Sequence, residues 1–238
     1  MPLACAWNTE VGPTMTTRLL AAVLALTCAL APVACAGSIR GTLRVPSARA
    51  QATAGAGAYP GHANSLPGVH DMAKGVVTDA VVYVERIPAA SESTLASTRS
   101  APPKLAQKDQ MFMPRVVAIA VGSSVDFPNM DPIYHNVFSA SPVRRFDLGK
   151  YPKGNSRRVD FRKPGLVNVY CDIHSNMEAF ILVLPNHAFA RPSAAGEFAL
   201  PDLPPGSYQL HVWHPDLGEQ RLPVEVPASG DVIEALSY

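Results

Sequence analysis

The sequence predicts an all-β protein whose central part is a sandwich of Greek-key type. Two observations carry this prediction: short strand-like segments follow one another with Gly, Pro and Asn between them, and no stretch sustains the period of a helix. The 238 residues are 47% hydrophobic, which is ample for a packed core. With 20 Lys and Arg against 19 Asp and Glu, no global field favours nucleic acid or an anionic membrane.

The N-terminal segment has the features of a secretory signal peptide. Arg18 precedes an apolar run over residues 19–33, which is too short for a comfortable membrane span, and the small-residue sequence Ala34-Cys35-Ala36 follows. We predict that residues 1–36 are removed before Gly37. The mature protein is then expected in the periplasm, without a membrane span.

Two other interpretations of this segment are less favoured. Cleavage before Cys35 with lipid attachment is disfavoured by Pro32, which stands where such sites usually carry leucine. An uncleaved anchor is disfavoured further. Residues 1–14 lack the basic start of a signal peptide, so Met15 is the expected initiator.

Cysteine use makes one thiol stand out. Cys5, Cys28 and Cys35 all fall within the predicted signal segment, which leaves Cys171 as the only thiol of the mature chain and excludes an internal disulfide. A lone thiol in an oxidising compartment is kept by deep burial or by metal coordination. The neighbours of Cys171 decide between these two.

The first strands are widely separated. Strands are predicted at residues 39–45 and 76–85, with an Ala/Gly/Pro-rich loop over residues 46–74 between them. Residues 88–103 are rich in Ala, Ser and Pro and are predicted to form a linker.

From Lys104 onward, strands and turns alternate closely. The predicted strands are residues 115–120, 124–127, 136–139, 156–161, 166–170, 179–184, 197–200, 208–213 and 222–226. Turns are supplied by Gly122, Asn129, Pro152 with Gly154, and Pro164 with Gly165. This is more strand than one small sandwich uses, so we expect two β-sandwich units.

Four residues form a candidate metal site. Cys171, His174 and Met177 are three residues apart and directly follow the predicted strand at 166–170, so a curled loop can aim a thiolate, an imidazole and a thioether at one point. His135 opens another predicted strand and can meet that loop at one end of the sandwich.

This donor set favours one mononuclear blue-copper ion. A thiolate, two imidazoles and a weak axial thioether serve Cu(I) and Cu(II) with little rearrangement, which permits fast electron transfer. Structural zinc usually takes four strong thiolate or imidazole ligands in paired loops. A two-copper centre needs a second bridging thiol. Neither can be built around the single Cys171.

Residues 104–184 resemble the cupredoxins, with a Cys-to-Met spacing more like amicyanin than plastocyanin. The resemblance rests on Phe127-Pro128-Asn129, His135-Asn136-Val137-Phe138-Ser139, Lys163-Pro164-Gly165, and Cys171-Asp172-Ile173-His174 through Met177. It implies equatorial copper ligands at the positions of His135, Cys171 and His174, and an axial ligand at Met177. Asn136 is then the supporting residue that hydrogen-bonds the two ligand-bearing loops together. If Met177 turned away, an oxygen or water would bind instead and open the site to chemistry.

A second resemblance, to the carboxypeptidase regulatory-like (transthyretin-like) sandwich, flanks the first. Its pattern consists of residues 39–43, 79–84, 196–200 and 203–208. We therefore expect a copper domain at residues 101–187 inserted between two parts of this sandwich, at residues 37–100 and 188–238; a simple tandem is the alternative. The resemblance implies a non-catalytic packing or docking role. A copper domain combined with this sandwich also looks like the periplasmic proteins that are grouped with methylamine utilisation. That grouping does not identify a redox partner.

The function predicted from the sequence is single-electron transfer between protein redox partners, without catalysis. Copper storage or delivery, and a copper site open to small ligands, are the alternatives. The basic segment 144–163, with eight cations against two acids, is expected to steer an acidic partner or to be an ordinary solvated face. Structural or surface roles are expected for His62, His70, His187, His211 and His214.

Overall fold

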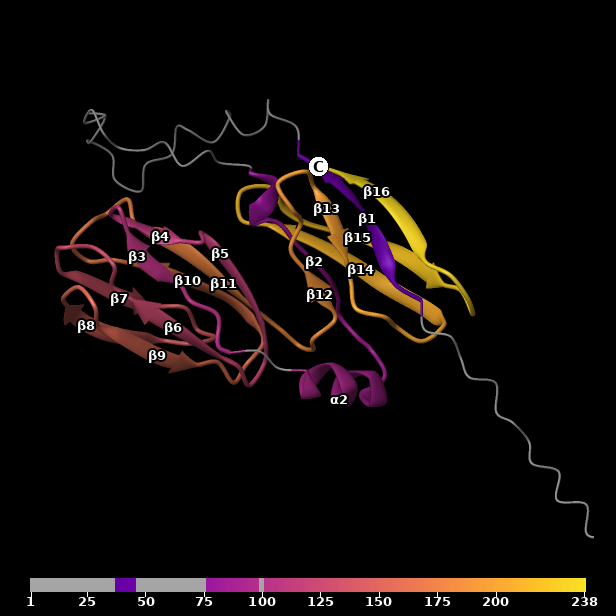
Figure 1. Ribbon diagram of the computed structural model, residues 1–238, viewed down its shortest axis with the longest axis horizontal. Helices are drawn as coiled ribbons and strands as arrows, with labels where there is room; N and C mark the ends of the chain where they lie inside the picture. Colours follow the sequence, from indigo (N-terminus) through magenta and orange to yellow (C-terminus); the bar gives the residue numbers. More distant parts are fainter. Residues whose placement is uncertain (1–36, 46–75, 99–100) are drawn as a thin grey trace, which may run out of the picture. The chain divides into compact units, whose positions relative to one another are not determined.

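A computed structural model describes residues 37–45, 76–98 and 101–238 (Figure 1). The predicted signal peptide, the predicted loop at 46–74 and the histidines His62 and His70 lie outside these ranges. Within the described residues there are sixteen strands, one α-helix and one short 3₁₀ helix, so the prediction of an all-β fold is confirmed. No helix in these ranges is long and apolar enough to cross a bilayer.

The central part of the chain is a two-layer β-sandwich. One layer is a five-stranded sheet with the order β5 (Val116–Ala120), β11 (Glu178–Leu184), β10 (Gly165–Tyr170), β7 (His135–Ser139) and β8 (Phe146–Tyr151). All neighbours in it are antiparallel except β5 and β11, which are parallel. The remaining strands are the pairs β6 (Ser124–Pro128) with β9 (Ser156–Asp160) and β3 (Ala106–Lys108) with β4 (Met111–Met113).

Both layers contribute to one hydrophobic core. In β6 the buried positions alternate with half-buried ones, so Val125 and Phe127 face inward, as the two-residue period of a strand requires. They join Val167, Val169 and Ile181 of the five-stranded sheet in one buried cluster. The prediction of a sandwich is therefore confirmed.

Strand register brings two distant segments to the same end of this sandwich. In the antiparallel pair of β10 and β7, Tyr170 lies opposite Phe138, and in the pair of β7 and β8, His135 lies opposite Tyr151. The start of β7 and the residue after β10 therefore lie close together. This is the end at which the sequence predicts the metal site.

Two further sheets combine strands from the beginning and the end of the described chain. The three-stranded sheet has the order β13 (Glu197–Ala199), β1 (Ile39–Arg44) and β16 (Val232–Ser237). The four-stranded sheet has the order β12 (Phe189–Ala190), β2 (Val81–Val84), β14 (Gly206–His214) and β15 (Gly218–Val226). Strands that precede residue 101 thus pair with strands that follow residue 188, as an insertion would require. The domain boundaries themselves stay a prediction.

The prediction of a linker over residues 88–103 is wrong in its first part, because Ala89–Ser97 form helix α2. No side chain caps this helix and none of its residues is buried, so no apolar stripe marks it in the sequence. A distant contact holds it instead. The Glu92 carboxylate accepts hydrogen bonds from the backbone N–H of His187 at 2.9 Å and pairs with its imidazole Nδ1 at 2.7 Å.

The predicted strand at residues 76–85 is also shorter than expected. Val77–Asp79 form the 3₁₀ helix η1 before β2 begins. Asp79 of this turn is buried and reaches the guanidinium of Arg115 at 3.2 Å.

Arg115 is a buried cation with three acidic partners. Besides Asp79, it contacts Asp216 at 2.7 Å and Glu178 at 3.3 Å, and its guanidinium lies 5.1 Å from the centre of the Phe180 ring. Burial alone would lower the pKa of Arg115, but Asp216 and Asp79 raise it, so the side chain stays charged. This residue links the start of β11 to η1 and to the turn after β14.

We predict that Arg115→Met lowers the free energy of unfolding by about 3–5 kcal/mol, because it leaves buried carboxylates without the guanidinium that they share. Chemical denaturation measures this difference. Arg158→Met is the control, since Arg158 forms an exposed ion pair with Asp126 that contributes about 0–1 kcal/mol. Equal losses in the two variants would contradict the role of Arg115.

Glu219 makes the four-stranded sheet sensitive to acid. Burial alone would raise its pKa, but hydrogen bonds from Tyr83, His211 and Arg221 lower the pKa from 4.5 to about 2. A carboxylate with a lowered pKa in the folded state stabilises the fold above its unfolded pKa, and this contribution is lost as the pH falls.

We therefore expect the contribution of Glu219 to be complete above pH 4.5 and to disappear as the pH approaches about 2. Urea denaturation at a series of pH values tests this. The unfolding free energy of Glu219→Gln should depend less on pH in this range than that of the unaltered protein. Identical pH dependence would show that Glu219 contributes nothing.

Candidate metal centre

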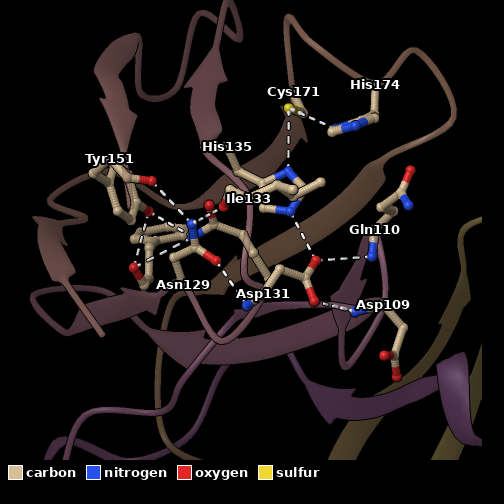
Figure 2. Close-up of polar contacts among 11 residues, drawn as sticks. Asp109, Gln110, Asn129, Asp131, Ile133, His135, Tyr151, Cys171 and His174 are labelled. Atoms are coloured by element: carbon tan, nitrogen blue, oxygen red, sulfur yellow. Dashed lines mark hydrogen bonds and ion pairs between the residues drawn. The ribbon is translucent and has the colours of Figure 1, made fainter. Parts of the chain in front are cut away.

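Three of the predicted ligands converge at one end of the sandwich. His135 begins β7, and Cys171 and His174 lie in the loop that follows β10 (Figure 2). Cys171 Sγ lies 4.0 Å from His135 Nδ1 and 4.0 Å from His174 Nδ1. Among the described residues, no other group of three His, Cys, Asp or Glu side chains brings its donor atoms within 4.8 Å of one another.

The spacing of the donor atoms suits a single metal ion. Metal bonds of ~2.0 Å to imidazole nitrogen and ~2.3 Å to thiolate sulfur place these atoms about 3.7 Å apart in a trigonal site. The observed sulfur–nitrogen distances of 4.0 Å differ from this by only a few tenths of an ångström. Small side-chain adjustments are therefore enough for all three donors to bind one ion.

The fourth predicted ligand, Met177, is buried, and it follows His174 by three residues in the chain. Its backbone N–H donates to the carbonyl of His174 at 3.1 Å, which closes a turn in the ligand loop. Its side chain belongs to the same buried cluster as Cys171. The role of Met177 as an axial ligand stays a prediction.

A carboxylate fixes the imidazole of His135. His135 Nε2 lies 2.7 Å from Asp131 Oδ2, and both side chains are buried. Because an ionised carboxylate only accepts hydrogen bonds, Nε2 is the nitrogen that donates to Asp131, and Nδ1 is the nitrogen that faces Cys171. Asp131 thereby selects the tautomer that can bind a metal through Nδ1.

A hairpin turn holds Asp131 from the other side (Figure 2). The backbone N–H groups of Asp109 and Gln110, between β3 and β4, donate to its two carboxylate oxygens at 2.6 Å and 2.9 Å. Both turn residues have positive φ, 54° and 57°, which is unusual for residues other than glycine. Their hydrogen bonds to Asp131 offset this unfavourable backbone conformation.

Asn129 organises the segment that leads into His135. Its side-chain amide donates to the carbonyls of Ile133 and Tyr151, each at 2.9 Å, and its carbonyl oxygen accepts from the backbone N–H of Asp131 at 2.9 Å. The sequence indicates only a turn at Asn129. The structure shows that this turn also sets the position of Asp131.

One of the predicted ligands, His174, and the carboxylate of Asp131 beside the ligands have shifted pKa values. Burial alone would raise the pKa of Asp131, but the Gln110 N–H, the His135 imidazole and the Asp109 N–H together hold it below its usual value. Burial lowers the pKa of His174, and the neighbouring His135 lowers it further. Both shifts favour an ionised carboxylate and a neutral imidazole, which are the forms that a metal site needs.

The structure gives Asn136 a different hydrogen bond from the expected one. Its amide nitrogen donates to the Asp147 carboxylate of β8 at 2.7 Å, and that carboxylate also accepts from the Gly149 N–H. Asn136 therefore ties β7 to β8 rather than to the Cys171 loop. Its side-chain oxygen is buried and has no hydrogen-bond partner among the described residues.

His174 is the donor nearest to solvent. His135 is fully buried and Cys171 is 5% exposed, whereas His174 is half-buried. Large exposed apolar side chains occur next to His174 and in the loop that precedes His135. They are Met130, Ile133, Tyr134 and Ile173. We call these four residues the apolar rim.

The basic segment 144–163 is divided between the two ends of the sandwich. Lys150 pairs with Asp172 at 3.8 Å, and the Arg157 guanidinium lies over the Tyr151 ring, so both are at the ligand end. The cations at the other end are Arg144, Arg145, Arg162 and Lys163.

The remaining described histidines make contacts outside this group. His187 pairs with Glu92, His211 hydrogen-bonds Glu219 at 3.0 Å and stacks on Tyr83, and His214 lies 3.2 Å from the carbonyl of Val76.

No protein-family model matches the sequence, and a comparison with curated proteins found no match. The chain is similar to three solved structures. The copper-containing nitrite reductase from Thermus scotoductus SA-01 shares 27% identity over 36% of this chain and 23% of its own, with a TM-score of 0.34. A mutant of amicyanin in the Cu(I) form shares 17% identity over 44% of this chain and 98% of its own, with a TM-score of 0.33. A purple cupredoxin from Nitrosopumilus maritimus shares 20% identity over 35% of this chain and 99% of its own, with a TM-score of 0.32.

The chain thus spans about a quarter of the length of the nitrite reductase chain. The amicyanin and purple cupredoxin chains are covered almost completely.

We predict that Asp131→Asn weakens copper binding 10- to 100-fold and destabilises the fold by about 1–3 kcal/mol. An amide cannot accept from two backbone N–H groups and from His135 Nε2 at once, so at least one buried donor loses its partner. Competition with a copper chelator and urea denaturation measure the two effects. Asp172→Asn, on the exposed part of the ligand loop, is the control and should change neither.

Proposed function

We propose that the protein is a periplasmic mononuclear copper protein of the blue type that carries single electrons between redox partners. The observation that carries this proposal is the convergence of Cys171 Sγ with the Nδ1 atoms of His135 and His174 at 4.0 Å each. A thiolate with two imidazoles is the donor set that suits blue copper. Copper held there would supply one-electron chemistry by alternating between Cu(I) and Cu(II).

The surroundings of the donors favour electron transfer because they resist rearrangement. His135 is held by Asp131, and Asp131 is held by the turn at Asp109 and Gln110. Cys171 lies in the sandwich core. Donors that keep one geometry in both oxidation states need little reorganisation when an electron arrives or leaves. Met177 is proposed as the weak axial ligand on the buried side.

The route for the electron is proposed to pass through the exposed edge of His174. Ile173 of the apolar rim directly precedes His174, and the other rim residues lie just before His135 in the chain; exposed apolar side chains of this kind are ones that a partner protein covers. The cations at the ligand end, which include Lys150, Lys153 and Arg157, are proposed to steer an acidic partner toward this edge. The predicted docking role of segment 144–163 is thus restricted here to its ligand-end residues.

The experiment that tests this function is optical and magnetic spectroscopy of the exported protein loaded with Cu(II). We expect an intense thiolate-to-copper charge-transfer band in the visible spectrum, which disappears in Cys171→Ser. Met177→Leu is the matched variant: it should keep the band but shift the reduction potential, because the axial ligand tunes it. The Met-to-Leu exchange conserves volume, so the loss of stability should stay below about 1.5 kcal/mol.

A colourless copper-loaded protein would contradict the blue-copper proposal. Ready transfer of Cu(I) to an acceptor protein, without reversible oxidation and reduction, would favour storage or delivery instead. Binding of small anions at the copper would favour a site open to chemistry and would argue against axial Met177.

A further inference from the structure

The end of the sandwich opposite Cys171 carries a basic pocket. Its volume is about 480 Å³, and two turns that are distant in sequence form it, one between β7 and β8 and the other between β9 and β10. The lining residues are Val143, Arg144, Arg145, Asp160, Arg162 and Lys163. Four cationic side chains and one carboxylate, that of Asp160, therefore line the pocket.

These cations are not neutralised by the protein. Asp160 is occupied by a hydrogen bond from the Ser124 hydroxyl at 2.7 Å. In the part of the chain that the structure describes, none of the four cations forms an ion pair. Four like charges around one hollow repel one another unless an anion lies between them.

The two turns are packed directly against each other, so the pocket is part of the fold. Gly165 begins β10 with a φ of 132°, and a Cβ atom built there would lie 2.7 Å from Val143 Cγ2. The backbone of one turn thus rests on a side chain of the other. In addition, the backbone N–H of Asn168 donates to the Ser141 hydroxyl at 2.9 Å.

The pocket is separate from the candidate metal centre. β10 runs from Gly165 beside the pocket to Tyr170, just before Cys171. Six residues of extended strand span about 20 Å. A molecule bound in the pocket therefore does not contact His174 or the apolar rim.

We propose that this pocket binds a small, multiply charged oxyanion of the phosphate class. The planar forks of Arg144, Arg145 and Arg162 suit paired phosphate oxygens, and Lys163 adds a point charge. The basic charge is not continuous along this face, because Asp126 neutralises Arg158 between the two ends. This discontinuity favours a compact ligand over an extended acidic segment of a partner protein.

The test is a titration of the copper-loaded protein with pyrophosphate. Calorimetry measures the binding, and the visible spectrum monitors the copper in the same samples. We expect saturable binding that weakens at least tenfold in the double variant Arg144→Gln/Arg162→Gln. The control is Lys108→Gln/Lys153→Gln, which removes the same charge from exposed positions outside the pocket and should bind normally. The copper spectrum should not change, since the pocket and the metal are far apart.

No saturable binding, or equal binding by both double variants, would overturn the proposal. Binding of an acidic peptide without binding of pyrophosphate would also overturn it and would assign the surface to protein docking. The proposal does not depend on the function of the metal centre, because the charge-transfer band reports that function separately in the same samples.

Discussion

The hydrogen bond between Asp131 and His135 is the interaction on which the candidate metal centre depends. It joins a buried carboxylate to the Nε2 atom of a buried imidazole at 2.7 Å, and it leaves Nδ1 free to face Cys171. The hairpin turn at Asp109 and Gln110 and the side chain of Asn129 support the same carboxylate. These contacts fix the orientation of the His135 imidazole, and donors held in one orientation are what low reorganisation requires.

The sequence predicted the converging ligands but not the residue that orients them. Cys171 and His174 were predictable because they share one loop at the end of a strand, and His135 because it opens a neighbouring strand. Asp131 has no such signal: Asp before Pro132 is typical of a turn, and its buried partner becomes visible only when the β3–β4 hairpin packs against it. For Asn136, the resemblance implied a bond to the Cys171 loop, whereas the structure shows one to β8.

The fold was predictable where buried apolar residues alternate or run together, as in β10 and β11. It was not predictable where distant contacts decide the local structure. Helix α2 buries no residue and depends on His187, and β8 contains Gly149 with a φ of 62° among charged residues. The basic segment shows the same limit, since charges that are neighbours in sequence lie at opposite ends of a strand pair. Only the structure separates its ligand end from the basic pocket.

The most direct test of this account is the protonation of His135 in the metal-free protein, measured by long-range proton–nitrogen NMR of the imidazole ring. The account predicts a proton on Nε2, hydrogen-bonded to Asp131, and an unprotonated Nδ1 toward Cys171. Asp131→Asn should weaken or abolish this preference. A proton found on Nδ1 in the unaltered protein would contradict the account, because the imidazole would then present no lone pair to a metal beside Cys171.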